Sequence, residues 1–527
     1  MTTVSNRSFA QIRQALLDRE EIALIDVREE APFAESHPLF AANIALSKLE
    51  LEVYSRIPRR DTQVTVYDNG EGMAERAAER LIALGYTRVS LLEGGLDGWR
   101  RAGGELFIDV NVPSKAFGEL VESERHTPSL AAEEVQALLD NQADVVVLDA
   151  RRFDEYQTMS IPTGISVPGA ELVLRARELA PDPATRIIVN CAGRTRSIIG
   201  TQSLINAGVA NPVSALRNGT IGWTLAGQKL AHGQSRRFAP TSEAHRQVAA
   251  AHARRVADKA RVGRATLADL QRWQQEPART TYLFDVRTPE EFEAGHLPGA
   301  RSTPGGQLVQ ETDHVASVRG ARLVLADDDG VRANMSASWL AQLGWEVHVL
   351  DHLQAADFSE KGAWVAPVPA PAQAELISPH TLADWLTHGD TAILDFTPSV
   401  NYVKRHIPGA FWALRAQLPQ ALAKVKPAER YVLTCGTSQL ARLAVAEVEA
   451  ITGKPVFLLQ GGTLNWIAEN LPLEEGETHL ASPRIDRYRR PYEGTDSPKE
   501  AMQAYLDWEF GLVDQLARDG THGFYVI

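Results

Sequence analysis

The stretch Ile187-Ile188-Val189-Asn190-Cys191-Ala192-Gly193-Arg194-Thr195-Arg196-Ser197 decides the fold of this chain. It starts as an apolar, β-branched run typical of a buried strand, and a helical pattern follows from Ser197 to Ala207. A strand that leads through a short loop into a helix directs backbone N–H groups and the positive helix end toward the loop. We therefore expect the pKa of the Cys191 thiol to lie below its usual range, with help from Arg194 and Arg196.

A buried structural cysteine is the alternative, and it is a common fate of a free thiol. Gly, Arg and Ser residues surround Cys191, however, where a core would supply apolar neighbours. This environment favours a functional thiol.

Composition limits the class of protein. A chain of 527 residues is too long for one core, and 44% hydrophobic with 23% charged residues is typical of a soluble globular protein of several domains. A net charge of −13 argues against nonspecific nucleic-acid binding. Cys191 and Cys435, the two cysteines, are too few for a disulfide framework or a thiolate metal site, so no metal is expected. No signal peptide or membrane-length apolar segment is visible, which predicts a cytoplasmic protein without a membrane partner.

One structural unit recurs four times along the chain. An apolar strand ends at Asp26, Asp149, Asp285 and Asp395, as ALIDVR, VVVLDAR, YLFDVR and AILDFT. Amphipathic helical patterns precede these strands at residues 9–19, 130–139, 267–273 and 380–386. A second strand ends at Asp68, Cys191, Asp327 and Cys435, which is 42 positions after the first aspartate in three copies and 40 in the fourth. Alternating strands and helices of this kind predict an α/β fold in which each domain is a parallel sheet with helices on both faces.

These repeats divide the chain into four domains and two further segments. We predict domains at residues 1–112, 125–238, 265–370 and 374–478, a helical connector at 239–264 and a tail with a docking helix at 482–527. A basic interaction helix is the alternative for the connector.

The motifs of the repeats resemble those of the rhodanese family of sulfurtransferases. Residues 291–300 read EFEAGHLPGA and residues 401–410 read NYVKRHIPGA, and a Gly followed by a Trp recurs at Gly95 and Trp99, Gly219 and Trp223, and Gly462 and Trp466. The second copy departs from the pattern because it has Ser160-Ile161-Pro162 without the histidine, and the first is looser at His37. The resemblance covers roughly residues 8–475.

This resemblance implies that Cys191 carries a sulfur atom as a persulfide. Related phosphatases and arsenate reductases have a loop of seven residues, whereas Cys191 to Arg196 spans six, which favours sulfur over an oxyanion. The persulfide would be held by backbone N–H groups of residues 192–197, among them those of Ala192, Gly193, Thr195 and Ser197. Arg194, Arg196 and Arg151 would attract an anionic donor such as thiosulfate, although a structural ion pair with Asp149 is the alternative for Arg151. The reaction needs no cofactor or metal.

The other three copies differ at the position of the nucleophile. Asp68 and Asp327 cannot carry sulfur, so we read domains 1 and 3 as inactive. Cys435 lies in the loop Cys-Gly-Thr-Ser-Gln-Leu, which lacks the final Arg but resembles the mercaptopyruvate-using branch at its start. The alternation resembles two-domain members of the family, so we expect two such pairs placed end to end, the first of which, residues 1–238, is self-sufficient.

The tail has its own pattern. A cluster of arginines and tyrosines comes first, formed by Arg484, Arg487, Tyr488, Arg489, Arg490 and Tyr492. A helix rich in apolar side chains follows near residues 498–518. We expect this segment to dock on the body of the protein or on a second copy in a homodimer, rather than on nucleic acid.

Together these features predict a sulfurtransferase that acts on small sulfur-containing anions and delivers sulfur to cyanide, a small thiol or a protein thiol. The alternative is a scaffold or persulfide-carrier protein without turnover, because two of the four nucleophile positions are aspartates.

Overall fold

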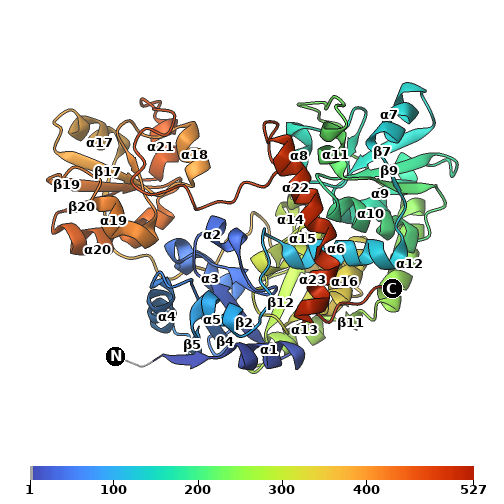
Figure 1. Cartoon of the computed structure of the whole chain (residues 1–527), viewed down its shortest axis with the longest axis horizontal. Coiled ribbons are helices and arrows are strands. Elements are labelled where there is room, and N and C mark those ends of the chain that lie inside the picture. Colours follow the sequence, from blue (N-terminus) through green and yellow to red (C-terminus); the bar gives the residue numbers. More distant parts are fainter. Residues whose placement is uncertain (1–3) are drawn as a thin grey trace.

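A computed structural model describes residues 4–527 of the protein, in which four parallel five-stranded sheets follow one another along the chain (Figure 1). All four sheets have the same strand order, which is β1-β5-β4-β2-β3 in the first domain. Helices cover both faces of each sheet, as the repeats predict. The predicted fold class is therefore confirmed.

The bounds of the elements are as follows. Domain 1 contains β1 (Ser5–Arg7), α1 (Phe9–Leu17), β2 (Ile22–Asp26), α2 (Glu30–Glu35), β3 (Ala42–Asn43), η1 (Leu46–Lys48), α3 (Leu49–Arg56), β4 (Gln63–Tyr67), α4 (Met73–Ala83), β5 (Val89–Leu92) and α5 (Gly95–Arg101). Domain 2 contains β6 (Ser129–Leu130), α7 (Ala132–Asp140), β7 (Val145–Asp149), α8 (Phe153–Thr158), β8 (Ile165–Ser166), η2 (Gly169–Glu171), α9 (Leu172–Leu179), β9 (Arg186–Asn190), α10 (Thr195–Asn206), β10 (Val213–Leu216) and α11 (Gly219–Leu225).

The second half repeats this order. Domain 3 contains β11 (Gly263–Ala265), α13 (Leu267–Gln274), β12 (Thr281–Asp285), α14 (Pro289–Ala294), β13 (Arg301–Ser302), α15 (Gly305–Gln310), η3 (Thr312–His314), β14 (Arg322–Ala326), α16 (Arg332–Gln342), β15 (Glu346–Leu350) and η4 (Ala355–Asp357). Domain 4 contains β16 (Glu375–Ile377), α17 (Pro379–Leu386), β17 (Thr391–Asp395), α18 (Ser399–Lys404), β18 (Phe411–Trp412), η5 (Arg415–Gln417), α19 (Leu418–Leu422), β19 (Arg430–Thr434), α20 (Gln439–Thr452), β20 (Val456–Leu459) and α21 (Gly462–Ala468). The four predicted amphipathic helices correspond to α1, α7, α13 and α17.

Four helices lie outside the repeats. They are α6 (Val112–Arg125), α12 (Glu243–Lys259), α22 (Lys499–Phe510) and α23 (Leu512–Asp519). Helix α12 forms the predicted helical connector, and its small side chains Ala249, Ala253 and Ala257 are buried against α9 and α16. The third sheet already starts at Gly263, inside the range given to the connector, because β11 pairs with β15.

The tail docks on the body of the protein, as expected. Figure 1 shows α22 and α23, in red, beside α6 after the chain has crossed from domain 4. The single helix expected near residues 498–518 is instead two helices that meet at Gly511. Leu512 and Leu516 of α23 pack with Val112 and Ala116 of α6.

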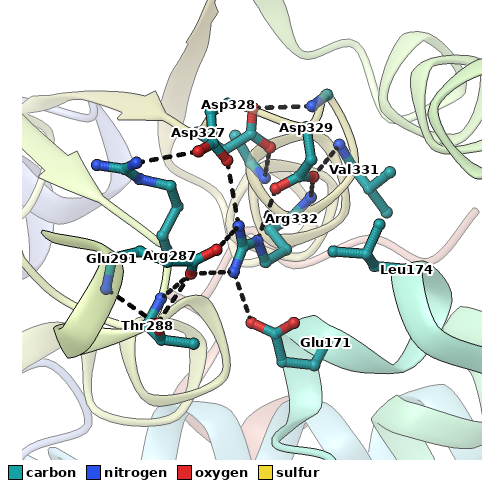
Figure 2. A network of polar contacts seen from close by, with 12 residues as sticks. Glu171, Leu174, Arg287, Thr288, Glu291, Asp327, Asp328, Asp329, Val331 and Arg332 are labelled. Atoms are coloured by element: carbon teal, nitrogen blue, oxygen red, sulfur yellow. Dashed lines mark hydrogen bonds and ion pairs between the residues drawn. The ribbon is translucent and has the colours of Figure 1, made fainter. Parts of the chain in front are cut away.

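The domains pair in a nested order, which corrects the expectation of two pairs placed end to end. In domain 2, η2 contacts α15 of domain 3, and in domain 1, η1 contacts η5 of domain 4. Across the first interface, the buried Arg332 pairs with Glu171 of domain 2 and with acids of its own domain (Figure 2). Across the second, Arg415 pairs with Glu50 at 2.7 Å.

The hydrophobic cores follow this arrangement. One continuous buried cluster joins domains 1, 2 and 3 with α6 and α12, and it includes Leu49, Phe117, Leu172, Val256 and Leu323. Domain 4 has its own clusters, such as the one built on Leu433, Ala444 and Leu458. Domain 2 therefore shares part of its core with domains 1 and 3, whereas the main cores of domain 4 are separate. None of the helices within residues 4–527 has the length and apolarity that a membrane crossing requires.

Candidate active site

The Cys191 loop joins the end of β9 to α10. Strand β9 pairs with β7 so that Asn190 lies opposite Asp149, which places the Asp149-Ala150-Arg151 turn beside the loop. Helix α10 starts at Thr195, two residues earlier than the pattern predicted. Parallel strands expose their carboxyl ends at one edge of the sheet, and this is where α/β proteins bind ligands.

The thiol of Cys191 lies at the bottom of this loop. The side chain is 1% exposed, and Sγ donates a hydrogen bond to Oγ of Ser197 at 3.3 Å. Backbone N–H groups of Thr220 and Ile221 donate to the carbonyls of Cys191 and Ala192 and hold the loop against α11. The close approach of α11 to the loop requires glycine at position 219. Its φ is +55°, and a Cβ atom there would lie 2.3 Å from the carbonyl oxygen of Cys191.

The corresponding loops of domains 1 and 3 show what this loop shape binds. The carboxylate of Asp68 accepts hydrogen bonds from the backbone N–H groups of Gly70, Met73 and Ala74. In domain 3, Asp327 accepts hydrogen bonds from Gly330 and Ala333 in the same way. Each loop is therefore a cradle of N–H donors for an anion, and in these two domains the chain's own carboxylate fills it.

The expected low pKa of Cys191 is wrong in this structure. Burial raises the pKa of the thiol above its usual range, and it outweighs the opposing effects of Arg196 and of the hydrogen bonds with Ser197. The sequence shows the positive groups around the loop but not the exclusion of water from it.

Arg196 is held beside the thiol by Glu155 of α8. The two groups form a bidentate pair at 2.7 and 2.9 Å. Burial disfavours the charged form of Glu155, but Arg196 outweighs it and lowers the pKa of the carboxyl to about 2. Arg196 also borders a cleft of about 590 Å³ in which Lys404, Arg487 and Arg490 gather.

The other two predicted arginines have different positions. Arg151 forms a buried bidentate pair with Asp149 at 2.9 and 2.8 Å, which is the structural ion pair left open as an alternative. Arg194 is turned away from Cys191 toward α6, where it pairs with Glu119 at 2.7 and 2.8 Å and also with Glu122. The expectation that Arg194 attracts the donor is therefore corrected, because acids of α6 already neutralise its charge.

The remaining predicted residues line the loop from the other side. Ala192 packs in a buried cluster with residues of the tail, and Gly193 lies directly under Tyr505. Thr195 starts α10 and packs against Gly118 of α6. No repeat or fixed spacing in the sequence predicts that α6 or the tail lies against this loop.

Several residues of the site were missed by the sequence reasoning. They are Glu119, Glu155, Tyr505 and Glu509. A signal was available for Glu155, since the pair Glu155–Arg196 recurs in domain 3 as Glu291–Arg332 with the same separation of 41 residues. No comparable repeat points to the other three.

Cys435 occupies the corresponding loop of domain 4. Backbone N–H groups of Thr437, Leu440 and Ala441 face its sulfur, and burial raises the pKa of the thiol. Thr397 replaces the arginine of the Asp-x-Arg turn, so burial raises the pKa of Asp395 to about 6. Within residues 4–527, Oδ2 of Asp395 has no hydrogen-bond partner. Domain 4 thus keeps the cradle and lacks its cations.

Comparison with known proteins agrees with this geometry. The family model described as the rhodanese-like domain matches residues 9–102, 131–226, 266–352 and 378–469, which together exceed half of the chain. A crystal structure of thiosulfate sulfurtransferase from Pseudomonas aeruginosa is 74% identical in sequence, with a TM-score of 0.99, 99% of this chain covered and 100% of that chain.

Two curated relatives match parts of the chain. Thiosulfate sulfurtransferase of Azotobacter vinelandii is 26% identical over 205 residues, which is 35% of this chain and 74% of that protein. An uncharacterized protein of Synechocystis sp. is 30% identical over 112 residues, which is 21% of this chain and 59% of that protein. With four family matches in tandem, each on its own parallel sheet, this chain belongs to the rhodanese-like domain family.

Proposed function

We propose that this protein is a sulfurtransferase that moves sulfane sulfur from thiosulfate or a similar donor, through a persulfide on Cys191, to a thiophilic acceptor. The observation that carries the proposal is the N–H cradle, which holds a carboxylate in domains 1 and 3, whereas in domain 2 the corresponding residue is a thiol that the backbone N–H of Ser197 faces. The Pseudomonas aeruginosa protein of the same architecture is a thiosulfate sulfurtransferase.

The first half-reaction is a displacement at sulfur. The thiolate of Cys191 attacks the outer sulfur of thiosulfate, the S–S bond of the donor breaks, and its electron pair leaves with sulfite. The new persulfide is an anion, and the N–H groups of the loop stabilise it as they stabilise the carboxylates of Asp68 and Asp327. In the second half-reaction, cyanide or a thiolate attacks the outer sulfur and releases the thiolate of Cys191.

The surroundings of the loop suit an anionic donor. Arg196 borders the cleft of about 590 Å³, and Lys404, Arg487 and Arg490 lie along its walls. Carboxylates of Asp154, Glu155, Glu311 and Glu493 line the same cleft, and Glu493 pairs with Arg487 and Arg490. The attraction of a dianion therefore rests on Arg196 and Lys404. The chemistry uses only the chain's own residues, and it suits a compartment such as the cytoplasm, in which thiols stay reduced.

Cys435 is a second candidate carrier, because three backbone N–H groups face its sulfur. Without an arginine in its loop, it should load more slowly from thiosulfate than Cys191 does. A donor with less negative charge, such as 3-mercaptopyruvate, would depend less on those cations.

The decisive experiment is persulfide formation followed by intact-protein mass spectrometry. Cys191→Ser should remove most of the sulfur uptake from thiosulfate and most thiocyanate formation, whereas Cys435→Ser should retain both. If Cys191→Ser kept more than about half of the activity, the assignment of the main carrier would be wrong, since loss of a nucleophile costs orders of magnitude. Uptake without turnover would favour the alternative of a persulfide carrier.

A further inference from the structure

The C-terminal tail forms one wall of the Cys191 site. Tyr492 and Tyr505 of the tail are buried in one cluster with Ala192 of the loop. A Cβ atom added at Gly193 would lie 3.2 Å from Cε1 of Tyr505 and 3.5 Å from Oε2 of Glu509. Helix α22 therefore places a carboxyl group directly over the loop.

Glu509 is an unusual residue in this wall. It is 0% exposed, and its Oε1 accepts a hydrogen bond from the hydroxyl of Tyr505 at 2.8 Å. Its other oxygen, Oε2, has no hydrogen-bond partner within residues 4–527 and faces Gly193. Burial of a carboxyl oxygen without a hydrogen-bond partner costs free energy, so its position calls for a functional explanation.

The charges around Glu509 already have other partners. The titratable groups that face it are Lys115 and Glu119 of α6, Cys191 and Arg194 of the loop, and Tyr505 of its own helix, with Tyr492 in the same cluster. Lys115 pairs with Asp109 at 2.6 Å, and Arg194 pairs with Glu119 at 2.7 Å. Burial therefore dominates and raises the pKa of Glu509 to about 8. The group is mostly a neutral acid near pH 7.

We propose that Glu509 acts as an acid in sulfur transfer: its Oε2–H donates a hydrogen bond to a sulfonate oxygen of thiosulfate at the mouth of the Cys191 loop and then protonates the departing sulfite. This inference rests on the proposed function. A carboxylate at this place would repel the dianion, whereas a neutral acid both avoids the repulsion and supplies a donor.

The step balances in atoms and charge. A Cys191 thiolate, thiosulfate and protonated Glu509 give the Cys191 persulfide anion, hydrogen sulfite and the Glu509 carboxylate. The bond between Sγ and the outer sulfur forms, and the S–S bond of thiosulfate breaks. When a thiol acceptor then takes the sulfur, its S–H proton returns to Glu509; when cyanide is the acceptor, the proton comes from solvent.

The test is the pH dependence of single-turnover sulfur uptake, measured by mass spectrometry in a Cys435→Ser background. Uptake should rise with pH as the thiol ionises, level off above about pH 8, where loss of the Glu509 proton offsets further ionisation, and fall once the pH passes the raised pKa of the Cys191 thiol. Glu509→Gln keeps the shape of the side chain and a donor but has no proton to transfer. It should load about 100-fold more slowly at neutral pH and show no alkaline fall.

Glu500→Gln is the matched control, because Glu500 lies on the exposed face of the same helix. It should keep the wild-type profile. An unchanged alkaline fall in Glu509→Gln, or uptake at the wild-type rate, would overturn the role of Glu509 alone. A wild-type protein that takes up no sulfur would instead refute the proposed function and the Glu509 role with it.

A second readout does not require turnover. The infrared spectrum of the folded protein at neutral pH should contain a carbonyl band of a protonated carboxylic acid that disappears in Glu509→Gln and remains in Glu500→Gln. Addition of thiosulfate should shift this band, because the acid then donates a hydrogen bond. A spectrum without a Glu509-dependent band would show that the residue is ionised and would overturn the proposal.

Discussion

At the scale of single residues, Arg196 is the cation that we propose the site uses beside Cys191. Both oxygens of Glu155 hold it, and this pair orients the guanidinium at the wall of the cleft. We expect Arg196→Ala to lower kcat/KM for thiosulfate about 100-fold and Arg196→Lys about 10-fold, since lysine keeps the charge without the bidentate geometry. Initial rates at limiting thiosulfate measure both.

The control for this pair of variants is Arg255→Ala, which removes an exposed arginine of α12. It should leave kcat/KM unchanged. If Arg196→Ala matched the wild type at limiting thiosulfate, the charge of Arg196 would be irrelevant to donor binding.

Sequence reasoning reached part of this site. Cys191, Arg196 and the N–H cradle follow from a contiguous loop, so the pattern of strand, loop and helix is enough to predict them. The pKa of Cys191 could not be predicted, because it depends on the burial that α6 and the tail impose. Glu509 could not be found for the same reason, since its contact with Gly193 exists only in the folded chain.

At the scale of elements, α23 anchors the tail. Leu516 is buried with Leu512 and with Val112 of α6, and α22, which carries Glu509, ends where α23 begins. Leu516→Ala should cost at least about 2 kcal/mol locally and raise the fraction of molecules with an undocked tail about 30-fold. The reaction of Cys191 with a thiol reagent, measured in a Cys435→Ser background, should accelerate accordingly.

Leu464→Ala is a suitable control, because this leucine of α21 is 54% exposed and lies in domain 4. Its labelling rate should equal that of the parent. Equal rates in Leu516→Ala and the parent would mean that the tail does not limit access to Cys191.

The elements themselves were largely predictable. Amphipathic patterns identified α1, α7, α13 and α17, and the Asp-ended strands identified the sheet centres. Helix α6 lay at the boundary between two predicted domains and was missed, although it has Pro113 in its first turn. Gly511 divides the predicted tail helix into two helices that both contact α6, and this packing is a tertiary effect.

At the scale of the whole molecule, four similar domains could be arranged in several ways. The segments that meet at the interfaces occupy the same place in each repeat, starting at Leu46, Gly169, Gly305 and Arg415. Because all four copies carry such a segment, the sequence does not indicate which two meet. The nested order follows from side chains specific to each pair, such as Arg332 with Glu171 and Arg415 with Glu50.

This order changes what the first half of the chain can do alone. Residues 1–238 lack domain 3, which packs on domain 2, and they lack the tail that covers the Cys191 loop. We therefore no longer expect that fragment to be self-sufficient. The full chain offers a sharper test, because a buried arginine lies at each interface: Arg332 between domains 2 and 3, and Arg415 between domains 1 and 4.

Arg332 and Arg415 are the matched pair for that test, because both are buried and both hold carboxylates across an interface (Figure 2 for Arg332). Removal of Arg332 leaves the buried Asp329 without its ion-pair partner, at a cost of about 3–5 kcal/mol. Removal of Arg415 should cost less, because Arg80 still pairs with Glu447 at 3.1 Å and lies 3.8 Å from Glu50. Arg332→Ala should loosen domain 3 from domain 2 and reduce sulfur uptake at Cys191. Arg415→Ala should release domain 4, seen as faster proteolysis between domains 3 and 4, while uptake at Cys191 persists. If Arg415→Ala impaired Cys191 as much as Arg332→Ala did, the active site would depend on domain 4, and the nested pairs would not be separate functional units.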